Sequence, residues 1–360
     1  MLRALARVDL GAISRNCALL ARTVGPGTAL CAVVKADGYG HGAVPAARAA
    51  LAGGASWLAV ATAEEAAGLR AAGLDGPVMV MGALSAEELE VAVAARADVV
   101  AWREGFVEQL AALPGAEGIG VHVKLDTGMG RLGTRDAEEA LGVVHEVAAQ
   151  PRLRLAGAMT HFATADDDPA FMDAQLRAFA PWAASVRDEF PDVLVHAANS
   201  AATLRGPAAH FDLVRCGVAI YGLDPFQADA AAVGLELRSY VAEVKRARPG
   251  ESVGYGRRFV AGSPTWIGTL PIGYADGYRR GLTNDAQVLI GGRPYPLVGT
   301  VSMDNITVDL GPGDEARDLR GAPAVVLGPG FPAEEWARRL GTINYEVTCG
   351  IGPRVPRDYA

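Results

Sequence analysis

Short apolar runs separated by longer mixed segments make up the first 225 residues of the chain. Most of these runs are continuous stretches of aliphatic residues rather than alternating ones, which is typical of strands buried on both faces of a sheet. Eight such runs occur, at residues 30–35, 57–61, 78–81, 98–102, 120–125, 155–161, 194–198 and 213–218. The pattern therefore predicts eight buried strands.

The segments between most of these runs have the character of helices. They include residues 62–72, 85–95, 136–150 and 169–189. The second opens with Ser85 and carries Glu88 three residues later, which is the capping box found at helix starts. Strand and helix that alternate eight times in about 225 residues predict a (β/α)8 TIM-like barrel. The last of the eight units is poor in helical character.

A different pattern begins after Asp224. Strand-like runs follow one another with turns rich in Gly, Pro and Asp between them, and one helix is expected at residues 333–340. The strands are expected at residues 237–248, 251–259, 266–272, 287–290, 306–310 and 324–327. We therefore expect an α/β chain in which a barrel domain, residues 1–225, precedes a mainly β C-terminal domain, residues 226–360.

Composition narrows the partners and the compartment. Half of the 360 residues are apolar, and the net charge is −8 from 33 basic and 41 acidic residues. An acidic chain is poorly suited to nucleic acid or an anionic membrane. No stretch approaches the roughly 20 apolar residues that span a bilayer, and the first residues lack the apolar core of a signal peptide. We expect a soluble cytoplasmic protein.

The four cysteines are scattered along the chain. Cys17, Cys31, Cys216 and Cys349 form no CxxC pair, so their spacing favours neither a disulfide nor a metal site. We expect no metal, and thiols that are reduced and buried.

Lysine is rare in this chain, since only three of the 33 basic residues are lysines. Arginine keeps its proton, whereas an amine can lose one and form a Schiff base with a carbonyl compound. Lys35 and Lys124 both fall in predicted barrel strands, so they are candidates for chemistry that arginine cannot perform. For Lys245, the simpler interpretation is that a lysine occupies this position by chance and has no chemical role.

Barrel enzymes place their active sites at the carboxyl ends of the strands. The polar residues that end the predicted strands, or follow them, are Lys35, Tyr39, Asp126, Arg131, His161, Asn199, Ser200, Arg215 and Gly217. Lys35 ends an apolar run, so desolvation favours the neutral amine that a carbonyl cofactor needs. The alternative is a lysine that extends its ammonium group to solvent from a strand end.

Eight motifs spread over nearly the whole chain resemble those of alanine racemase and occur in that family's order. They are AVVKADGYGHG (32–42), KLDTGMGRLG (124–133), THFA (160–163), ANS (198–200), VRCG (214–217), VGYG (253–256), SMD (302–304) and INYE (343–346). The resemblance implies a homodimer that uses pyridoxal 5′-phosphate (PLP), with a (β/α)8 barrel and a C-terminal β domain. This architecture agrees with the one predicted above.

The resemblance implies that Lys35 holds PLP as a covalent imine and is also one of two bases. Tyr255 is the other base, and it reaches the active site from the partner subunit. The enzyme would interconvert L-alanine and D-alanine on a PLP aldimine and supply D-alanine for peptidoglycan. Racemisation takes a proton from one face and returns one to the other, which a single base at ordinary reach does not easily do. Lys35 would act on the D-enantiomer and Tyr255 on the L-enantiomer.

The other cofactor contacts also follow from the resemblance. Arg215 would face the pyridine nitrogen and His161 would orient it. Because arginine only donates hydrogen bonds, the ring nitrogen would stay unprotonated, which limits side reactions such as transamination. The phosphate would be held by Tyr39, Ser200, Tyr345 and the backbone amides of Gly217 and Val218, with Asn199 as a neighbour of the cofactor.

The same resemblance places Arg131 and Met303 at the substrate carboxylate. Lys124 is a candidate for carbamylation, which would let it pair with Arg131. Tyr274 would line the entrance, with a packed strand tyrosine as the alternative. Two residues depart from the family pattern, Thr300 and Ser302. These two departures do not change the predicted class of reaction. They leave open how access to the active site is controlled and how fast the enzyme turns over.

Four other functions fit parts of the sequence. A PLP-dependent decarboxylase of the same barrel class would place a cysteine base where Tyr255 stands. A broad-specificity racemase would need only small changes in the pocket. A PLP-binding homeostasis protein would match the barrel alone. A non-enzymatic amino-acid sensor would keep the pocket and need no pair of bases.

Overall fold

The computed structural model describes residues 2–227 and 234–360, which form two compact units. One unit is Ile13–Ile220. The other combines the described parts of Met1–Ala12 and Tyr221–Ala360. The second unit is thus discontinuous in sequence, because strand β1 (Leu5–Val8) pairs with two strands from the C-terminal part of the chain. The sequence analysis had placed these first residues with the barrel.

The unit Ile13–Ile220 contains an eight-stranded parallel sheet in the order β8-β7-β6-β5-β4-β3-β2-β9. Its strands are β2 (Ala29–Val33), β3 (Trp57–Val60), β4 (Val78–Val80), β5 (Asp98–Ala101), β6 (Ile119–Lys124), β7 (Leu153–Met159), β8 (Leu194–His196) and β9 (Leu213–Cys216). Each overlaps one of the eight predicted runs. Nearly all of their residues are buried, as continuous apolar runs require.

The sheet curves into a nearly closed barrel. Strand β9 pairs in parallel with β2, which brings the last strand of the sheet to the first. Between β8 and β9, the backbone amides of Asp212 and Arg215 donate to the carbonyls of Val195 and Ala198, at 3.0 and 2.9 Å. The TIM-like architecture predicted from the sequence is confirmed.

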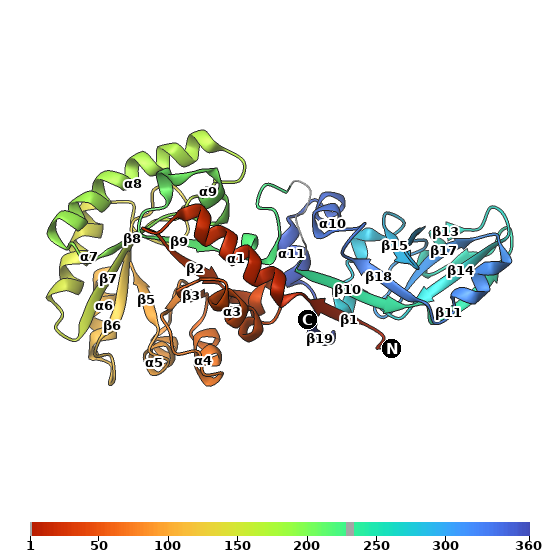
Figure 1. Ribbon diagram of the computed structural model, residues 1–360, viewed down its shortest axis with the longest axis horizontal. Coiled ribbons are helices and arrows are strands. Elements are labelled where there is room, and N and C mark those ends of the chain that lie inside the picture. Colours follow the sequence, from red (N-terminus) through yellow and green to blue (C-terminus); the bar gives the residue numbers. More distant parts are fainter. Residues whose placement is uncertain (1, 228–233) are drawn as a thin grey trace. The chain divides into compact units, whose positions relative to one another are not determined.

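Helices alternate with the strands of this unit (Figure 1). They are α1 (Leu10–Val24), α2 (Lys35–Tyr39), α3 (Ala43–Ala52), α4 (Ala63–Ala71), α5 (Ala86–Ala94), α6 (Glu104–Ala112), α7 (Ala137–Ala149), α8 (Pro169–Glu189) and α9 (Ser200–Arg205). The capping box predicted at Ser85 and Glu88 is present, and Thr62 with Glu65 forms a second one at the start of α4. The eighth unit is short of helix, as expected.

The second unit is mainly β. Its larger sheet has the order β16-β15-β18-β10-β1-β19, and the smaller ones are β11-β14-β17 and β12-β13. The strands beyond β1 are β10 (Leu235–Tyr240), β11 (Glu243–Ala247), β12 (Ser252–Val253), β13 (Phe259–Val260), β14 (Thr265–Leu270), β15 (Gln287–Ile290), β16 (Arg293–Pro296), β17 (Ile306–Gly311), β18 (Pro323–Leu327) and β19 (Arg357–Tyr359). Helix α10 (Ala333–Leu340) matches its prediction, and α11 (Asn344–Cys349) follows it.

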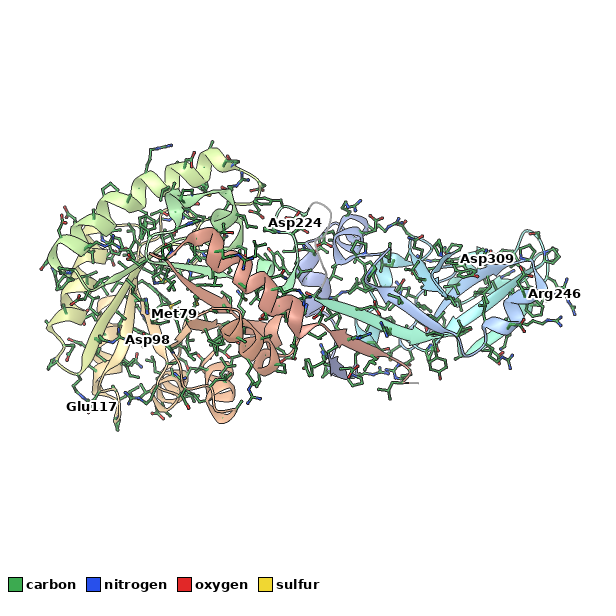
Figure 2. The ribbon with its side chains drawn as sticks, viewed as in Figure 1. Met79, Asp98, Glu117, Asp224, Arg246 and Asp309 are labelled. Atoms are coloured by element: carbon green, nitrogen blue, oxygen red, sulfur yellow. The ribbon has the colours of Figure 1, made fainter. Side chains whose placement is uncertain are left out.

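Two of the predicted strands are divided. Residues 237–248 form β10 and β11, which enter different sheets. Figure 2 labels Arg246 of β11 and Asp309 of β17, which both belong to the three-stranded sheet. Residues 251–259 contain β12 and β13 with the 3-10 turn Tyr255–Arg257 between them. Strand β16 was missed because its two prolines argue against a strand interior.

Two further expectations concern membranes and thiols. Within the described ranges, no helix combines the length and the apolar character needed to cross a bilayer. Cys17, Cys31 and Cys216 are free and buried, as expected. Cys349 is exposed at the end of α11, so the prediction of burial was wrong for this residue.

The capping box of α5 gives a direct test of local structure. The Ser85 hydroxyl accepts a hydrogen bond from the Glu88 amide at 3.2 Å, so Ser85→Ala should weaken the helix start by about 1 kcal/mol. Hydrogen exchange followed by mass spectrometry should show faster exchange over residues 86–89. The matched control is Ser56→Ala, an exposed serine outside any helix, which should leave this segment unchanged. Equal exchange in both variants would contradict the assignment.

Candidate active site

The predicted site residues of the barrel lie at the carboxyl ends of its strands. Lys35 comes two residues after the end of β2 and is half-buried, and Lys124 is the last residue of β6. His161 follows β7, and Arg215 lies near the end of β9. The carboxyl ends of parallel strands meet at one end of a barrel, so the fold brings these residues to one region.

The chain makes a left-handed turn directly after Lys35. Ala36, Asp37, Gly38 and Tyr39 have φ angles of 52°, 51°, 62° and 54°. For residues other than glycine this conformation costs about 1–2 kcal/mol each, so it persists only when the surroundings enforce it. The turn therefore fixes the direction of the backbone after Lys35.

Three side chains hold this turn. The Glu65 carboxylate accepts from the amide of Ala36 at 2.6 Å, and Asp37 accepts from the amide of Ala43 at 2.8 Å. The buried ring of His41 donates through Nδ1 to the carbonyls of Gly38 and Tyr39, at 3.1 and 3.0 Å. Glu65 is a supporting residue that the sequence analysis did not identify, because it belongs to the cap of α4.

Tyr39, Ser200 and Gly217 lie together. A Cβ atom at Gly217 would collide with the Tyr39 hydroxyl, so only glycine permits this approach. The Ser200 hydroxyl accepts from the amides of Gly217 and Ala219, at 3.0 and 3.3 Å. Hydroxyls and amides in a glycine-containing turn are suited to an anion. Val218 begins the 3-10 turn Val218–Tyr221 beside them.

Asn199 has a structural task in this region. Its side-chain oxygen accepts from the amide of Ala202 at 3.0 Å and caps helix α9. Because α9 begins with Ser200, this cap fixes the position of the Ser200 hydroxyl. The capped helix thus holds one part of the predicted phosphate site in place.

Arg215 is 3% exposed and has its guanidinium surrounded by acceptors. Its Nη2 atom donates to the carbonyls of Thr160 and Ala197, at 2.9 and 3.0 Å, and lies 3.2 Å from His161 Nδ1. The Nη1 atom donates to His196 Nδ1 at 2.7 Å. Burial lowers the pKa of Arg215 to about 10, so the group remains a cation at neutral pH.

Both histidines beside Arg215 are neutral. Burial, and then the charge of Arg215, lower the pKa of His161 and that of His196 well below the usual value. Arginine has only donors, so each histidine presents an unprotonated Nδ1 to it. The contact between His161 and Arg215 is the one that the resemblance led us to expect.

Lys124 is buried in a strongly positive environment. Its side chain is 4% exposed, and burial, then the charges of Arg215 and Arg131, lower its pKa to about 8. Asp126 partly offsets this effect. About a tenth of Lys124 is therefore a neutral amine at pH 7. Lys35, Lys124 and Arg131 also contribute to the low pKa of His161, which places these cations near one another.

Asp126 shapes the loop that carries Arg131. Its carboxylate accepts from the amides of Gly128 and Gly130, at 3.1 and 2.9 Å. Burial acts to raise the pKa of Asp126, but these hydrogen bonds outweigh it and lower the pKa. An ionised Asp126 therefore fixes the Gly-rich turn from which the exposed Arg131 extends.

Three predicted residues gather in the second unit. The Thr300 hydroxyl donates to the carbonyl of Tyr255 at 2.6 Å, and the amide of Tyr274 donates to the carbonyl of Ser302 at 3.0 Å. The loop of residues 299–305 thus joins the Tyr255 turn to the Tyr274 turn and carries Met303 between them. The side chains of Tyr255, Met303 and Tyr274 are 75%, 51% and 41% exposed.

This cluster settles one alternative and explains two departures from the family pattern. Tyr274 lies in an exposed 3-10 turn, Tyr274–Asp276, and is not a packed strand tyrosine. Thr300 is 6% exposed and supports the Tyr255 turn. The Ser302 hydroxyl donates to the carbonyl of Asn305 and accepts from its amide, so it closes a turn next to Met303.

Tyr345 is half-buried on helix α11 of the same unit. The helix is anchored by its first residue, Asn344, whose side-chain Nδ2 donates to the carbonyl of Asp224 and to the Glu334 carboxylate, at 2.9 and 2.7 Å. Asn344 is fully buried. Tyr345 is thus presented by a fixed element, and its contact with a phosphate stays a prediction.

Two buried histidines, His122 and His196, belong to the surroundings of Arg215 but were not singled out by the sequence analysis. Each lies inside an apolar run, at residues 120–125 and 194–198. An imidazole within a strand that is otherwise apolar was the available signal, because such a group needs a polar partner inside the barrel.

Comparisons with known proteins agree with this architecture. The family model for the alanine racemase N-terminal domain matches residues 8–225, and that for the C-terminal domain matches residues 234–359. The alanine racemase of Thermobifida fusca is 42% identical over 98% of this chain and 97% of its own length. That of Halalkalibacterium halodurans is 40% identical over 98% and 94%.

Solved structures give the same result. The alanine racemase from the D-cycloserine producer Streptomyces lavendulae aligns with a TM-score of 0.91 and 38% identity, covering 100% of this chain and 97% of that one. The enzyme from E. faecalis aligns with a TM-score of 0.92 and 34% identity, covering 99% and 98%. Both family models together span almost the entire sequence. The chain belongs to the alanine racemase family.

Proposed function

We propose that this racemase-family chain interconverts L- and D-alanine with PLP bound through Lys35, and that its active form is a homodimer with shared sites. The observation that carries the proposal is the buried Arg215, whose guanidinium is held by His161, His196 and two carbonyls at the same barrel end as Lys35. The family membership supports the same reaction. D-alanine for peptidoglycan is the proposed use of the product, in the cytoplasm.

The residues at this barrel end fit PLP. The hydroxyls of Tyr39 and Ser200 and the turn at Gly217 and Val218 suit its phosphate, with Asn199 fixing Ser200 through the α9 cap. Tyr345 is the further phosphate ligand that the family resemblance implies. Arg215, which only donates, suits the ring nitrogen, and Lys35 supplies the primary amine. PLP, when bound, withdraws electrons from the amino acid and makes its α-hydrogen acidic.

Two groups of this protein would move the α-proton. Lys35 Nζ would take or return it on the D side, and the Tyr255 hydroxyl would do so on the L side. The cations near the site, Arg131 among them, favour an anionic substrate carboxylate. Met303 and Tyr274 would border the substrate beside Tyr255, because the loop of residues 299–305 carries Met303 and is hydrogen-bonded to both tyrosine turns.

The exposure of Tyr255 supports a dimer. An aromatic side chain that is three-quarters exposed, beside half-exposed Met303 and Tyr274, forms an apolar patch of the kind that usually meets another surface. In the proposed dimer that surface is the barrel of a second copy. The match to the C-terminal family model over residues 234–359 argues against a homeostasis protein built from the barrel alone.

The shared site predicts complementation between inactive variants. Lys35→Ala and Tyr255→Phe should each reduce racemisation by at least about a hundredfold, because each removes one base. Co-expressed in equal amounts, they should form heterodimers with one intact site, so that about one quarter of all sites are active. Racemase activity of the purified mixture is the measurement.

The controls separate the dimer from the chemistry. Tyr240→Phe, on strand β10 of the same unit, should retain full activity. A mixture no more active than its components would show that Lys35 and Tyr255 act within one chain. Tyr255→Phe with full activity from L-alanine would contradict the two-base assignment. An amino-acid panel would reveal broad specificity, since small pocket changes shift selectivity by only about 1–3 kcal/mol.

We also propose that Lys124 is carbamylated and pairs with Arg131. Carbamylation needs the neutral amine, and a pKa of about 8 makes that form accessible near neutral pH. The product is an anion, which relieves the repulsion among Lys124, Arg131 and Arg215. The low exposure of Lys124 protects such an adduct from solvent.

Carbamylation of Lys124 can be measured by ¹³C NMR of enzyme equilibrated with ¹³CO₂. At fixed CO₂ pressure, the carbamate signal should increase as the pH rises through about 8, because the amine is protonated below this value. The signal should disappear in Lys124→Met and persist in Lys245→Met, whose lysine is exposed. An unmodified Lys124 in enzyme prepared with bicarbonate would rule the adduct out.

A further inference from the structure

A row of buried polar side chains runs from Arg215 through the interior of the barrel. Arg215 Nη1 lies 2.7 Å from His196 Nδ1, and His196 Nε2 lies 2.9 Å from His122 Nδ1. His122 Nε2 lies 3.4 Å from Asp98 Oδ2, the longest link, and Arg154 Nη2 is 3.0 Å from the same oxygen. We call Asp98, His122, His196 and Arg215 the imidazole chain.

The two ends of the imidazole chain fix the direction of every link. Arg215 can only donate, so His196 accepts at Nδ1 and, being neutral, carries its proton on Nε2. His196 Nε2 donates this hydrogen bond to His122 Nδ1, so the single ring proton of a neutral His122 lies on Nε2. An ionised Asp98 can only accept it. One arrangement of protons therefore satisfies all the links, with both imidazoles neutral.

The charge states of the end groups agree with this arrangement. Burial acts to raise the pKa of Asp98, but the hydrogen bond from His122 and the charge of Arg154 outweigh it and lower the pKa. Burial, then the charge of Arg215, keeps His196 neutral by lowering its pKa. The thiols of Cys31 and Cys216, next to Arg215, have pKa values raised by burial to about 12 and 11, so they carry no charge.

The sheet makes room for the imidazole chain at two glycines. A Cβ atom at Gly157 of β7 would collide with His122 Nδ1, the atom that faces His196. A Cβ at Gly120 of β6 would collide with the Asp98 carboxylate. The pairing of β6 with β7 also shifts register between Val121 and His122. A barrel interior is normally filled by apolar side chains. The two glycines and the register shift therefore make room for polar side chains that are unusual in this position.

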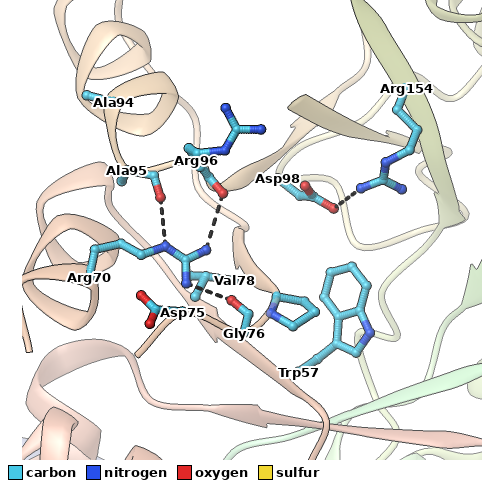
Figure 3. A pocket seen from close by; sticks show the side chains of 11 residues that line it. Trp57, Arg70, Asp75, Gly76, Val78, Ala94, Ala95, Arg96, Asp98 and Arg154 are labelled. Atoms are coloured by element: carbon cyan, nitrogen blue, oxygen red, sulfur yellow. Dashed lines mark hydrogen bonds and ion pairs between the residues drawn. The ribbon is translucent and has the colours of Figure 1, made fainter. Parts of the chain in front are cut away.

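The far end of the imidazole chain reaches the surface at the opposite end of the barrel. Asp98 is the first residue of β5, beside Met79 on β4 (Figure 2), and its side chain is 13% exposed. It borders a cavity of about 520 Å³ that Trp57, Arg70 and Arg154 also line (Figure 3). Arg70 is engaged there with backbone carbonyls, whereas Arg154 points to Asp98. The rings of Trp57 and His122 pack perpendicular to each other, with their centroids 5.7 Å apart.

We propose that Asp98, His122 and His196 are positioning residues that orient Arg215 and stabilise its charge from a distance. A carboxylate in contact with Arg215 would bring negative charge near the ring nitrogen of PLP and favour its protonation. Two imidazoles place that carboxylate at the other end of the barrel, where its direct effect on the ring is small. The hydrogen bonds of the imidazole chain still hold the guanidinium in place. Each bond polarises the next, so the nitrogen that faces Arg215 becomes a better acceptor. The role toward PLP rests on the proposed function.

The proton arrangement can be tested without any activity measurement. The chain has six histidines, so full-length protein labelled with ¹⁵N-histidine gives a short list of NMR signals. We expect His122 and His196 to be neutral with the proton on Nε2. The signals of each ring are assigned by their disappearance in His122→Gln and in His196→Gln. Asp98→Asn should shift the signals of both. A proton on Nδ1 of either ring, a doubly protonated ring, or an unmoved His196 would overturn the proposal.

A matched control exists on the surface. His145 Nε2 lies 2.9 Å from the Glu189 carboxylate, and both side chains are about half exposed. Glu189→Gln should shift the signals of His145 alone. If it also moved His122 and His196, the response to Asp98→Asn would be non-specific and the proposal would be overturned.

The effect on Arg215 is tested in the holoenzyme. Asp98→Asn, which preserves shape, should lower kcat by about tenfold with little change in KM, and it should raise the pyruvate formed per racemisation turnover. Gly157→Ala should act in the same direction by displacing His122. Unchanged kcat and pyruvate yield in Asp98→Asn would overturn the proposal. Failure of the protein to bind PLP would overturn the proposed function while the NMR result on the imidazole chain still stands.

Discussion

The buried guanidinium of Arg215 is the constraint on which the site depends. A cation at 3% exposure is tolerable only when its donors find acceptors, and here two carbonyls and two imidazoles supply them. Both histidines must then remain neutral, and Lys124 loses part of its charge in the same field. One fixed charge thus sets the protonation of its neighbours, and in the proposed function its donors suit a cofactor that presents an acceptor.

The turn that follows Lys35 is held in place by contacts other than those of Arg215. The left-handed turn after Lys35 contains three residues that are not glycine, and Glu65, Asp37 and His41 keep it in place. Its strain, roughly 1–2 kcal/mol for each such residue, is therefore offset by hydrogen bonds from neighbouring elements. The same turn brings Tyr39 against Gly217, so the amine and the proposed phosphate site are positioned by one short segment.

Much of the fold could be predicted because its signal is local. The eight barrel strands are continuous apolar runs, and α8 and α10 follow their predicted bounds. The error at residues 237–248 arose because a continuous strand-like pattern does not reveal that its two halves enter different sheets. The motifs identified Arg215 and His161, whereas His122 and Asp98 acquire their role only through partners on other strands, which no spacing in the sequence predicts.

The central claim is that Arg215 faces the ring nitrogen of PLP as a permanent donor. The most direct measurement is the ¹⁵N chemical shift of the ring nitrogen in protein loaded with ¹⁵N-labelled PLP. We predict the shift of an unprotonated nitrogen that accepts a hydrogen bond, and in Arg215→Glu, where a carboxyl group takes the place of the guanidinium, the shift of a protonated one. A protonated ring nitrogen in the unaltered protein would contradict the account.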